Sequence, residues 1–90
     1  TLEGTVPATF GEQADIVWRN ILAVLASAGM GTGDLVKVTM ILTSRDYLPV
    51  HREKRQQYLG EHKPAFTVIV AETLDPGWLL EVEAIAVADS

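Results

Sequence analysis

A change in hydrophobic period along the chain constrains its fold more than any other sequence feature. Residues 35–43 (LVKVTMILT) alternate and are rich in β-branched side chains, as strands are. Residues 66–72 (FTVIVAE) and 79–87 (LLEVEAIAV) are typical of two further strands. One side of the first strand is predicted to carry Val36, Val38, Met40 and Leu42. The chain therefore contains a β-sheet, and the segments between its strands determine what covers that sheet.

Two other segments have the three-to-four-residue period of amphipathic helices. The first covers about residues 11–29, where a final glycine suits the C-cap, and Thr9 with Glu12 resembles a capping box at its start. The second covers residues 46–59 and is expected to end at Gly60. The apolar face of the first helix is predicted to comprise Ala14, Val17, Ile21, Val24, Leu25 and Ala28.

The order of these elements predicts the fold class. An opening loop over residues 1–9 is followed by helix, strand, helix, strand and strand, which is typical of an α+β domain with two helices packed on one face of a mixed sheet. We expect one domain over residues 1–90. Three strands under two helices would leave sheet edges exposed, a condition that proteins usually avoid by adding strands or by association. Further strands or partner chains are therefore expected to complete the sheet.

The composition argues against several kinds of site and partner. The net charge of −5 disfavours nucleic acid, because binding phosphates requires clustered Lys and Arg. The chain has no cysteine and only two scattered histidines, so disulfides and thiolate metal sites are excluded and no metal site is expected. No apolar run approaches the roughly 20 residues of a membrane span, and no charged-then-apolar leader opens the sequence. We therefore expect a cytoplasmic protein that does not use a membrane as its partner.

Several short motifs occur along nearly the whole chain in a specific order. They are residues 4–7 (GTVP), Gln13 with Asn20, residues 28–29 (AG), 33–42 (GDLVKVTMIL), 64–65 (PA) and 81–87 (EVEAIAV). Each motif is weak alone, but their order and spacing together resemble the Rid (YjgF-like, RidA) family of reactive-intermediate deaminases.

This resemblance implies a chorismate-mutase-like Rid fold that assembles as a homotrimer. Small-molecule ligands would bind in clefts between subunits, built around the sheet face that is turned away from the helices. Family members also begin with an N-terminal hairpin that adds strands to the sheet and supplies a Ser-Gly pair and a tyrosine to the cleft. Nothing in this sequence corresponds to that hairpin, so the chain looks truncated relative to the family.

The resemblance also implies which residues carry chemistry. Glu81 falls on the glutamate that positions the attacking water, although a glutamate on a strand can also simply face solvent or pair with a basic side chain. Phe66 stands where the deaminases have an arginine that clamps the substrate carboxylate. A phenyl ring has no donor, so binding of anionic imino acids is in question, and the plain alternative is that Phe66 packs in a hydrophobic wall.

Other groups could replace the lost anchor. Arg52 aligns with a position near the family cleft and is the first candidate, while Thr67 and Val68 can contribute main-chain N–H and C=O groups. The remaining basic residues near the second helix and the following strand are expected to be solvated surface charges. These residues are His51, Lys54, Arg55, His62 and Lys63.

Two main hypotheses for function follow. The first is a cofactor-free hydrolytic deaminase of small imines or enamines that relies on Glu81 and depends less on carboxylate recognition. The second is a non-catalytic trimeric protein that binds a small molecule in the same cleft. The net negative charge and the lack of a basic stripe argue against a ribonuclease or translation-inhibitor role. A chorismate-mutase-like activity on a dicarboxylate would need several cleft arginines, and only four arginines are present in the chain.

Overall fold

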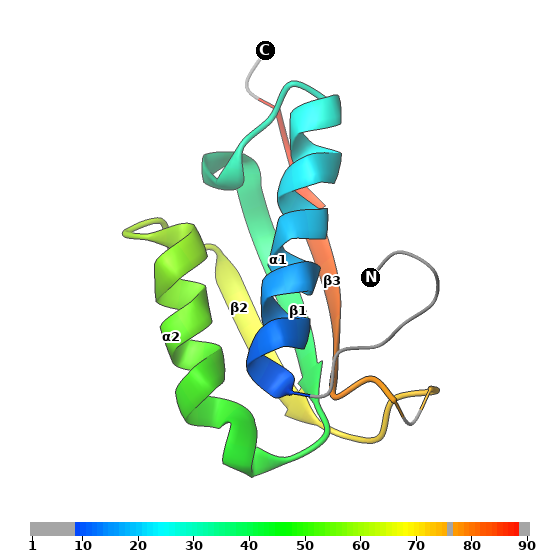
Figure 1. The fold of residues 1–90 in the computed structure, drawn as a ribbon. Coiled ribbons are helices and arrows are strands. Elements are labelled where there is room, and N and C mark those ends of the chain that lie inside the picture. Colours follow the sequence, from blue (N-terminus) through cyan, green and yellow to red (C-terminus); the bar gives the residue numbers. More distant parts are fainter. Residues whose placement is uncertain (1–8, 76, 89–90) are drawn as a thin grey trace.

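The structure, a computed structural model, describes residues 9–75 and 77–88. Two helices lie side by side on one face of a sheet, as Figure 1 shows, and the predicted α+β class is confirmed. The opening loop and residues 4–7 of the sequence motif lie outside the described residues, as does Pro76 in the turn before the last strand. The helices and strands are α1 (Phe10–Ser27), β1 (Leu35–Leu42), α2 (Leu48–Leu59), β2 (Ala65–Val70) and β3 (Leu80–Ala86), with short 3₁₀ turns at Thr32–Asp34 and Arg45–Tyr47.

The sheet has the strand order β2-β1-β3. β1 pairs in parallel with β2 and antiparallel with β3, so the predicted mixed sheet is confirmed. Within the described residues β2 and β3 are both edge strands, each with one side free of ladder partners. The exposed edges expected from the sequence are therefore present in the described part of the chain.

The side-chain alternation of β1 was predicted correctly except at its start. Val38, Met40 and Leu42 point to the helices and are buried, but Leu35 is only 2% exposed whereas Val36 is 47% exposed. The pairing of β1 with β3 shifts between Leu35 and Lys37. Such a bulge inserts one residue into the strand and reverses the alternation locally. The prediction that Val36 shares the buried side was therefore wrong.

The predicted capping residues at both ends of α1 are confirmed. The Thr9 hydroxyl oxygen accepts a hydrogen bond from the Glu12 amide (3.2 Å) and donates to the Glu12 carboxylate (2.7 Å). At the other end Gly29 has a φ of +72°, and the amide of Met30 donates to the carbonyl of Leu25 (2.8 Å). This 6→1 bond is that of a Schellman motif, which needs a residue in the left-handed region. Thr9 and Gly29 therefore set both ends of the helix.

The core lies between the helices and the sheet, and Trp18 at its centre is fully buried and stacked on the ring of Tyr58 (5.7 Å). Gln13 is also buried, and its side chain joins α1 to the segment before β3 by donating to the carbonyl of Gly77 (3.0 Å) and accepting from the amide of Leu79 (2.7 Å). The buried core side chains come from both helices and from β1 and β3, and they are Phe10, Ala14, Trp18, Leu25, Leu35, Val38, Met40, Leu42, Leu59 and Leu80.

Part of the predicted apolar face of α1 is not buried. Val24 is 69% exposed and Ala28 is exposed as well, although their spacing places them beside core residues. Both lie along a hollow between α1 and β3 that no described residue fills. The periodicity identified the correct face, but in the described residues the neighbouring elements cover only part of it.

Candidate functional site

The face of the sheet turned away from the helices carries Glu81. Glu81 pairs with Ile41 of β1, Glu83 pairs with Thr39, and Thr67 of β2 pairs with Thr39 from the other side. These side chains therefore share one face, because pairing residues in a sheet point the same way. We call this the open face, because neither helix covers it (Figure 1).

A shallow hollow of about 230 Å³ on the open face is lined by Thr39, Ile41, Glu81, Val82 and Glu83. Glu81 is exposed, and one of its carboxylate oxygens accepts a hydrogen bond from the amide of Leu74 (3.3 Å). An ionised carboxylate has room for about four hydrogen bonds, so this contact orients the group and leaves capacity to hold a water molecule. The hollow thus offers a positioned acceptor beside a second carboxylate.

Phe66 lies on the opposite side of the sheet from Glu81. It pairs with the buried Val38, and its ring packs against His51 (5.4 Å between ring centroids). The guanidinium carbon of Arg55 lies 4.0 Å from the centroid of the Phe66 ring. Within one chain, a small ligand on the open face therefore meets Glu81 but not the Phe66 ring.

The remaining predicted site residues divide between the two faces. Thr67 is exposed on the open face with Glu81, whereas Val68 pairs with Met40 and is half-buried under the helices. Arg52 is exposed on α2, where it borders a separate hollow. Only Thr67 is thus brought to the same face as Glu81, while Phe66, Val68 and Arg52 lie on the helix side.

The hollow beside Arg52 has a volume of about 180 Å³ and lies between the C-terminal half of α2 and the segment that leads into β2. Arg55, His62 and Lys63 also line it. The ring nitrogen Nε2 of His62 lies 2.8 Å from the carbonyl oxygen of Leu35, and because a carbonyl only accepts, Nε2–H is the donor. We call this hollow the α2 basic pocket.

His51 is a buried polar side chain next to this pocket. It is 2% exposed, and in the described residues neither ring nitrogen has a hydrogen-bond partner. Burial lowers the pKa of His51, and the charges of Arg55 and then Arg52 lower it further. The neutral imidazole is therefore the form that the native structure favours.

Asp15, Lys54 and Tyr58 join the two helices on their inner side. Lys54 Nζ lies 3.0 Å from one carboxylate oxygen of Asp15, and the hydroxyl of Tyr58 donates to the carboxylate at 2.8 Å. Burial alone would raise the pKa of Asp15, but the hydrogen bond from Tyr58 and the hydrogen bond and charge of Lys54 outweigh it, so the pKa is lowered. This cluster stabilises the packing of α1 on α2 and lies apart from both hollows.

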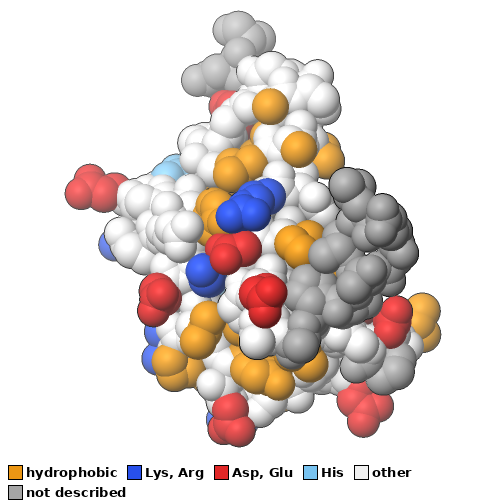
Figure 2. Space-filling view, viewed as in Figure 1, with side chains coloured by type: hydrophobic (Ala, Val, Ile, Leu, Met, Phe, Trp, Pro, Cys, Tyr) orange, Lys and Arg blue, Asp and Glu red, His pale blue; other side chains and the backbone are white. Residues whose placement is uncertain are grey.

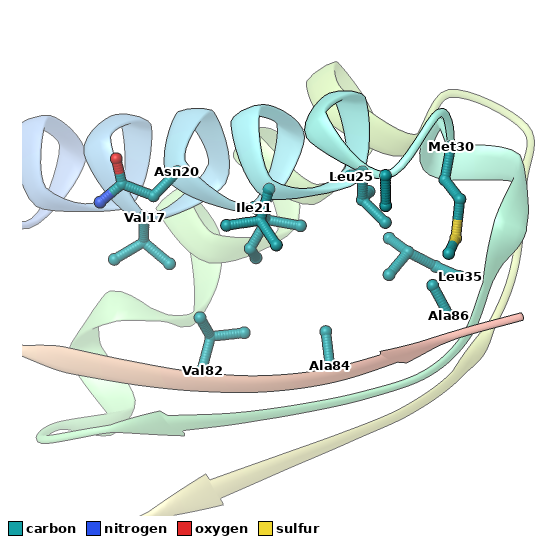
Figure 3. A pocket seen from close by; sticks show the side chains of 11 residues that line it. Val17, Asn20, Ile21, Leu25, Met30, Leu35, Val82, Ala84 and Ala86 are labelled. Atoms are coloured by element: carbon teal, nitrogen blue, oxygen red, sulfur yellow. The ribbon is translucent and has the colours of Figure 1, made fainter.

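Another hollow, of about 460 Å³, lies between α1 and β3. Its lining is mostly apolar, with Val17 and Ile21 of α1 facing Val82 of β3 and Asn20 as the polar side chain at its rim (Figure 3). Among the described residues that line it, none is titratable. This lining suits an apolar partner surface.

The visible described surface in Figure 2 has acidic and basic side chains interspersed, without a continuous basic stripe on that side. No group of three or more metal-ligating side chains is found within the residues that the structure describes. None of the helices in the described ranges has the length and hydropathy needed to cross a bilayer.

Comparison with known proteins supplies the family. The family model described as Endoribonuclease L-PSP matches residues 2–88, which is nearly the whole chain. The chain belongs to this Rid (YjgF-like) family. The predicted resemblance is thereby confirmed.

Rid proteins of known sequence and structure resemble the chain throughout its length. The 2-iminobutanoate/2-iminopropanoate deaminase of Escherichia coli is 30% identical over 87 residues, which cover 93% of this chain and 68% of the relative. Escherichia coli TdcF, solved with bound serine, superposes with a TM-score of 0.88 at 30% identity and covers 97% of this chain and 71% of its own. A Thermotoga maritima protein superposes with a TM-score of 0.90 at 34% identity, and the match covers 99% of this chain and 71% of the Thermotoga protein. The chain thus spans about two thirds of the length of these Rid relatives.

The prediction that the basic residues near α2 are solvated surface charges was wrong for His51, which is 2% exposed and packs against the Phe66 ring, and for Lys54, which is paired with Asp15. It was also wrong for a third residue of this Rid chain. Arg55 was expected to be a solvated surface charge, yet it stacks on Phe66 and borders the α2 basic pocket with Arg52. The spacing of three residues between Arg52 and Arg55 already places them on one side of a helix. That spacing was the available signal, but the proximity of Phe66 depends on how β2 packs under α2.

Proposed function

We propose that this Rid-family chain is part of a cofactor-free, cytoplasmic hydrolase that deaminates small imines or enamines. The observation that carries the proposal is the position of Glu81, whose carboxylate is held by the Leu74 amide at the hollow on the open face. The names of its Rid relatives supply the reaction class, since one of them is an iminobutanoate and iminopropanoate deaminase.

The proposed reaction requires only water and proton transfer. Water held by Glu81 adds its oxygen to the imine carbon, and the carboxylate takes a proton from it as the new C–O bond forms. The proton is passed to the nitrogen, which becomes an amine. The new hydroxyl group then gives its proton to the amine nitrogen as the C–N bond breaks, so ammonia leaves and the carbon remains as a carbonyl group. An enamine enters the same path after protonation on carbon gives the imine.

We further propose that the working unit is a homotrimer with its ligand clefts between subunits. The open face supports this proposal, because Ile69 is 44% exposed and Ile85 is 48% exposed there. Apolar side chains gathered on one uncovered face are typical of a protein–protein interface. A neighbouring chain would deepen the shallow hollow at Glu81 and exclude water around the carboxylate.

The alternative, a non-catalytic trimer that binds a small molecule, is favoured by one observation. Phe66 has no hydrogen-bond donor where the deaminases that it resembles place an arginine, and its ring is packed between His51 and Arg55. A protein that kept the cleft but lost the carboxylate clamp could still hold a ligand without turning it over.

Imines generated in place by an amino-acid oxidase separate these two functions. We expect the full-length protein to accelerate imine loss, and Glu81→Gln to reduce the rate by about 100-fold, which is the usual scale of a lost general base. Glu53→Gln is the matched control, because it removes an exposed carboxylate of α2 and should leave the rate unchanged. Acceleration that survives Glu81→Gln would exclude the proposed mechanism, and no acceleration with acidic or neutral amino-acid precursors would favour the binding protein.

A further inference from the structure

The α2 basic pocket is unusual for the charge of its lining. Arg52, Arg55, His62 and Lys63 all border it, and none of its lining residues is acidic. The chain as a whole has a net charge of −5, so this grouping runs against the general composition. A small cavity that gathers cationic side chains concentrates positive potential where an anion can enter.

Arg55 is held in place before any ligand arrives. Its guanidinium carbon lies 4.0 Å from the centroid of the Phe66 ring, which also packs against His51. A cation over an aromatic face is attracted by the ring quadrupole. The ring contains no acceptor oxygen, so the contact orders the guanidinium and leaves its N–H donors for an anion. A side chain that is already ordered loses less entropy on binding.

The arginine charges of the pocket are not neutralised within the described residues. The ion pair on α2 joins Lys54 to Asp15 toward α1, and none of the described carboxylates pairs with Arg52 or Arg55. The C-terminal end of a helix such as α2 carries roughly half an elementary negative charge, which disfavours a bound anion. Two arginines and Lys63 supply several full positive charges, so the pocket remains favourable to anions.

His51 lies within the electric field of the same two arginines. Burial is the main reason for the lowered pKa of His51, but the charges of Arg55 and Arg52 contribute in the same direction. Both guanidinium groups therefore act on a group behind the pocket. A bound anion would offset that action.

We propose that the α2 basic pocket binds a small carboxylate, with Arg55 as its anchor. The planar guanidinium matches the two oxygens of a carboxylate, which favours this group over a point-like anion. The volume of about 180 Å³ is below that of pockets for drug-sized ligands and suits a molecule of a few heavy atoms. The anion-binding group of this chain is then on α2, rather than at position 66 on β2.

The proposal does not depend on hydrolysis at Glu81. Pyruvate is a suitable probe, because it carries a carboxylate and contains no imine that could react. Binding to the full-length protein is measured by calorimetry at constant ionic strength, with neutral pyruvamide and inorganic phosphate as comparisons. We expect pyruvate to bind at least about tenfold more tightly than pyruvamide, since a tenfold change corresponds to one charge-assisted contact of modest strength. Equal binding of the two compounds would overturn the proposal, and so would tighter binding of phosphate than of pyruvate.

Two substitutions locate the site. Arg55→Gln should weaken pyruvate binding by about tenfold or more, and Arg52→Gln by a smaller factor. Arg45→Gln is the matched control, because it removes the same charge from an exposed residue of the 3₁₀ turn before α2 that does not line the pocket. Equal weakening by Arg55→Gln and Arg45→Gln would show that only net charge matters and would refute the pocket. Because pyruvate is not turned over, a failure of the proposed deamination leaves these measurements intact.

Discussion

His51 offers the sharpest test of the packing between α2 and the sheet. Its imidazole is 2% exposed, and in the described residues neither nitrogen is hydrogen-bonded. Replacing it by leucine keeps an apolar body of similar size and removes two buried polar atoms. A buried polar group without a partner costs about 1–3 kcal/mol. We expect His51→Leu to raise the free energy of unfolding at neutral pH by about 1 kcal/mol, because packing against Phe66 will not be reproduced in full.

The same substitution should change how stability depends on pH. Burial, aided by the charges of Arg55 and Arg52, makes the pKa of His51 lower in the folded state than its usual value of 6.5. The unfolded chain therefore binds more protons, so stability falls as the pH drops from about 6.5 toward the folded-state pKa. The loss grows as the pH is lowered from about 7 toward the folded-state pKa and then stops growing.

Urea unfolding of wild type and His51→Leu over this pH range measures the effect. His62 is present in both proteins, so its contribution cancels in the difference between them. Protein concentration must be equal throughout, because association adds to apparent stability. The difference should widen as the pH falls. Two curves that stay parallel would show that His51 is solvated or paired in the native protein, and would refute its placement under α2.

Three further predictions concern contacts that join distant segments. Gln13→Leu should lower the free energy of unfolding by about 1–3 kcal/mol, because it leaves the amide of Leu79 without its acceptor; thermal unfolding would measure this, and an unchanged melting temperature would contradict it. Asp15→Asn should lower the free energy of unfolding near neutral pH by about 1 kcal/mol, because the ion pair with Lys54 is partly exposed and therefore screened by solvent; urea unfolding would measure this. Since the folded-state pKa of Asp15 is lowered, this cost should vanish as the pH falls below its usual value of 3.8 and through the folded-state value; a cost that persists there would have another origin. Gly29→Ala should destabilise the chain by about 1 kcal/mol, as its φ of +72° disfavours a Cβ; a neutral result by urea unfolding would mean that the Schellman turn relaxes.

The family and the element order could both be predicted from the sequence, and the comparisons and the structure bear them out. Short motifs kept their order from the first helix to the last strand, and hydrophobic periods distinguished helices from strands. The ends of α1 were also predictable, because Thr9 and Gly29 act on groups within a few residues of themselves. Signals of this kind depend on local backbone geometry and need no partner from elsewhere in the chain.

The candidate sites were less accessible from the sequence. Arg52 and Arg55 were visible as neighbours on one helix, but their hollow is also lined by His62 and Lys63, and Arg55 stacks on the ring of Phe66. These groups come from a loop and a strand that lie beside α2 only in the tertiary structure. Sequence spacing could not show that Arg55 is ordered by an aromatic ring instead of being free in solvent.

What the sequence alone determined is therefore the set of elements, their ends and the family to which they belong. The tertiary structure decided which face each functional side chain occupies. Glu81 and Phe66 lie on opposite faces because β3 and β2 pair with β1 in particular registers, and a shift of one residue in either register would exchange faces. The bulge after Leu35 arises from the same pairing. Register depends on contacts between distant segments, and the period of a single strand does not contain that information.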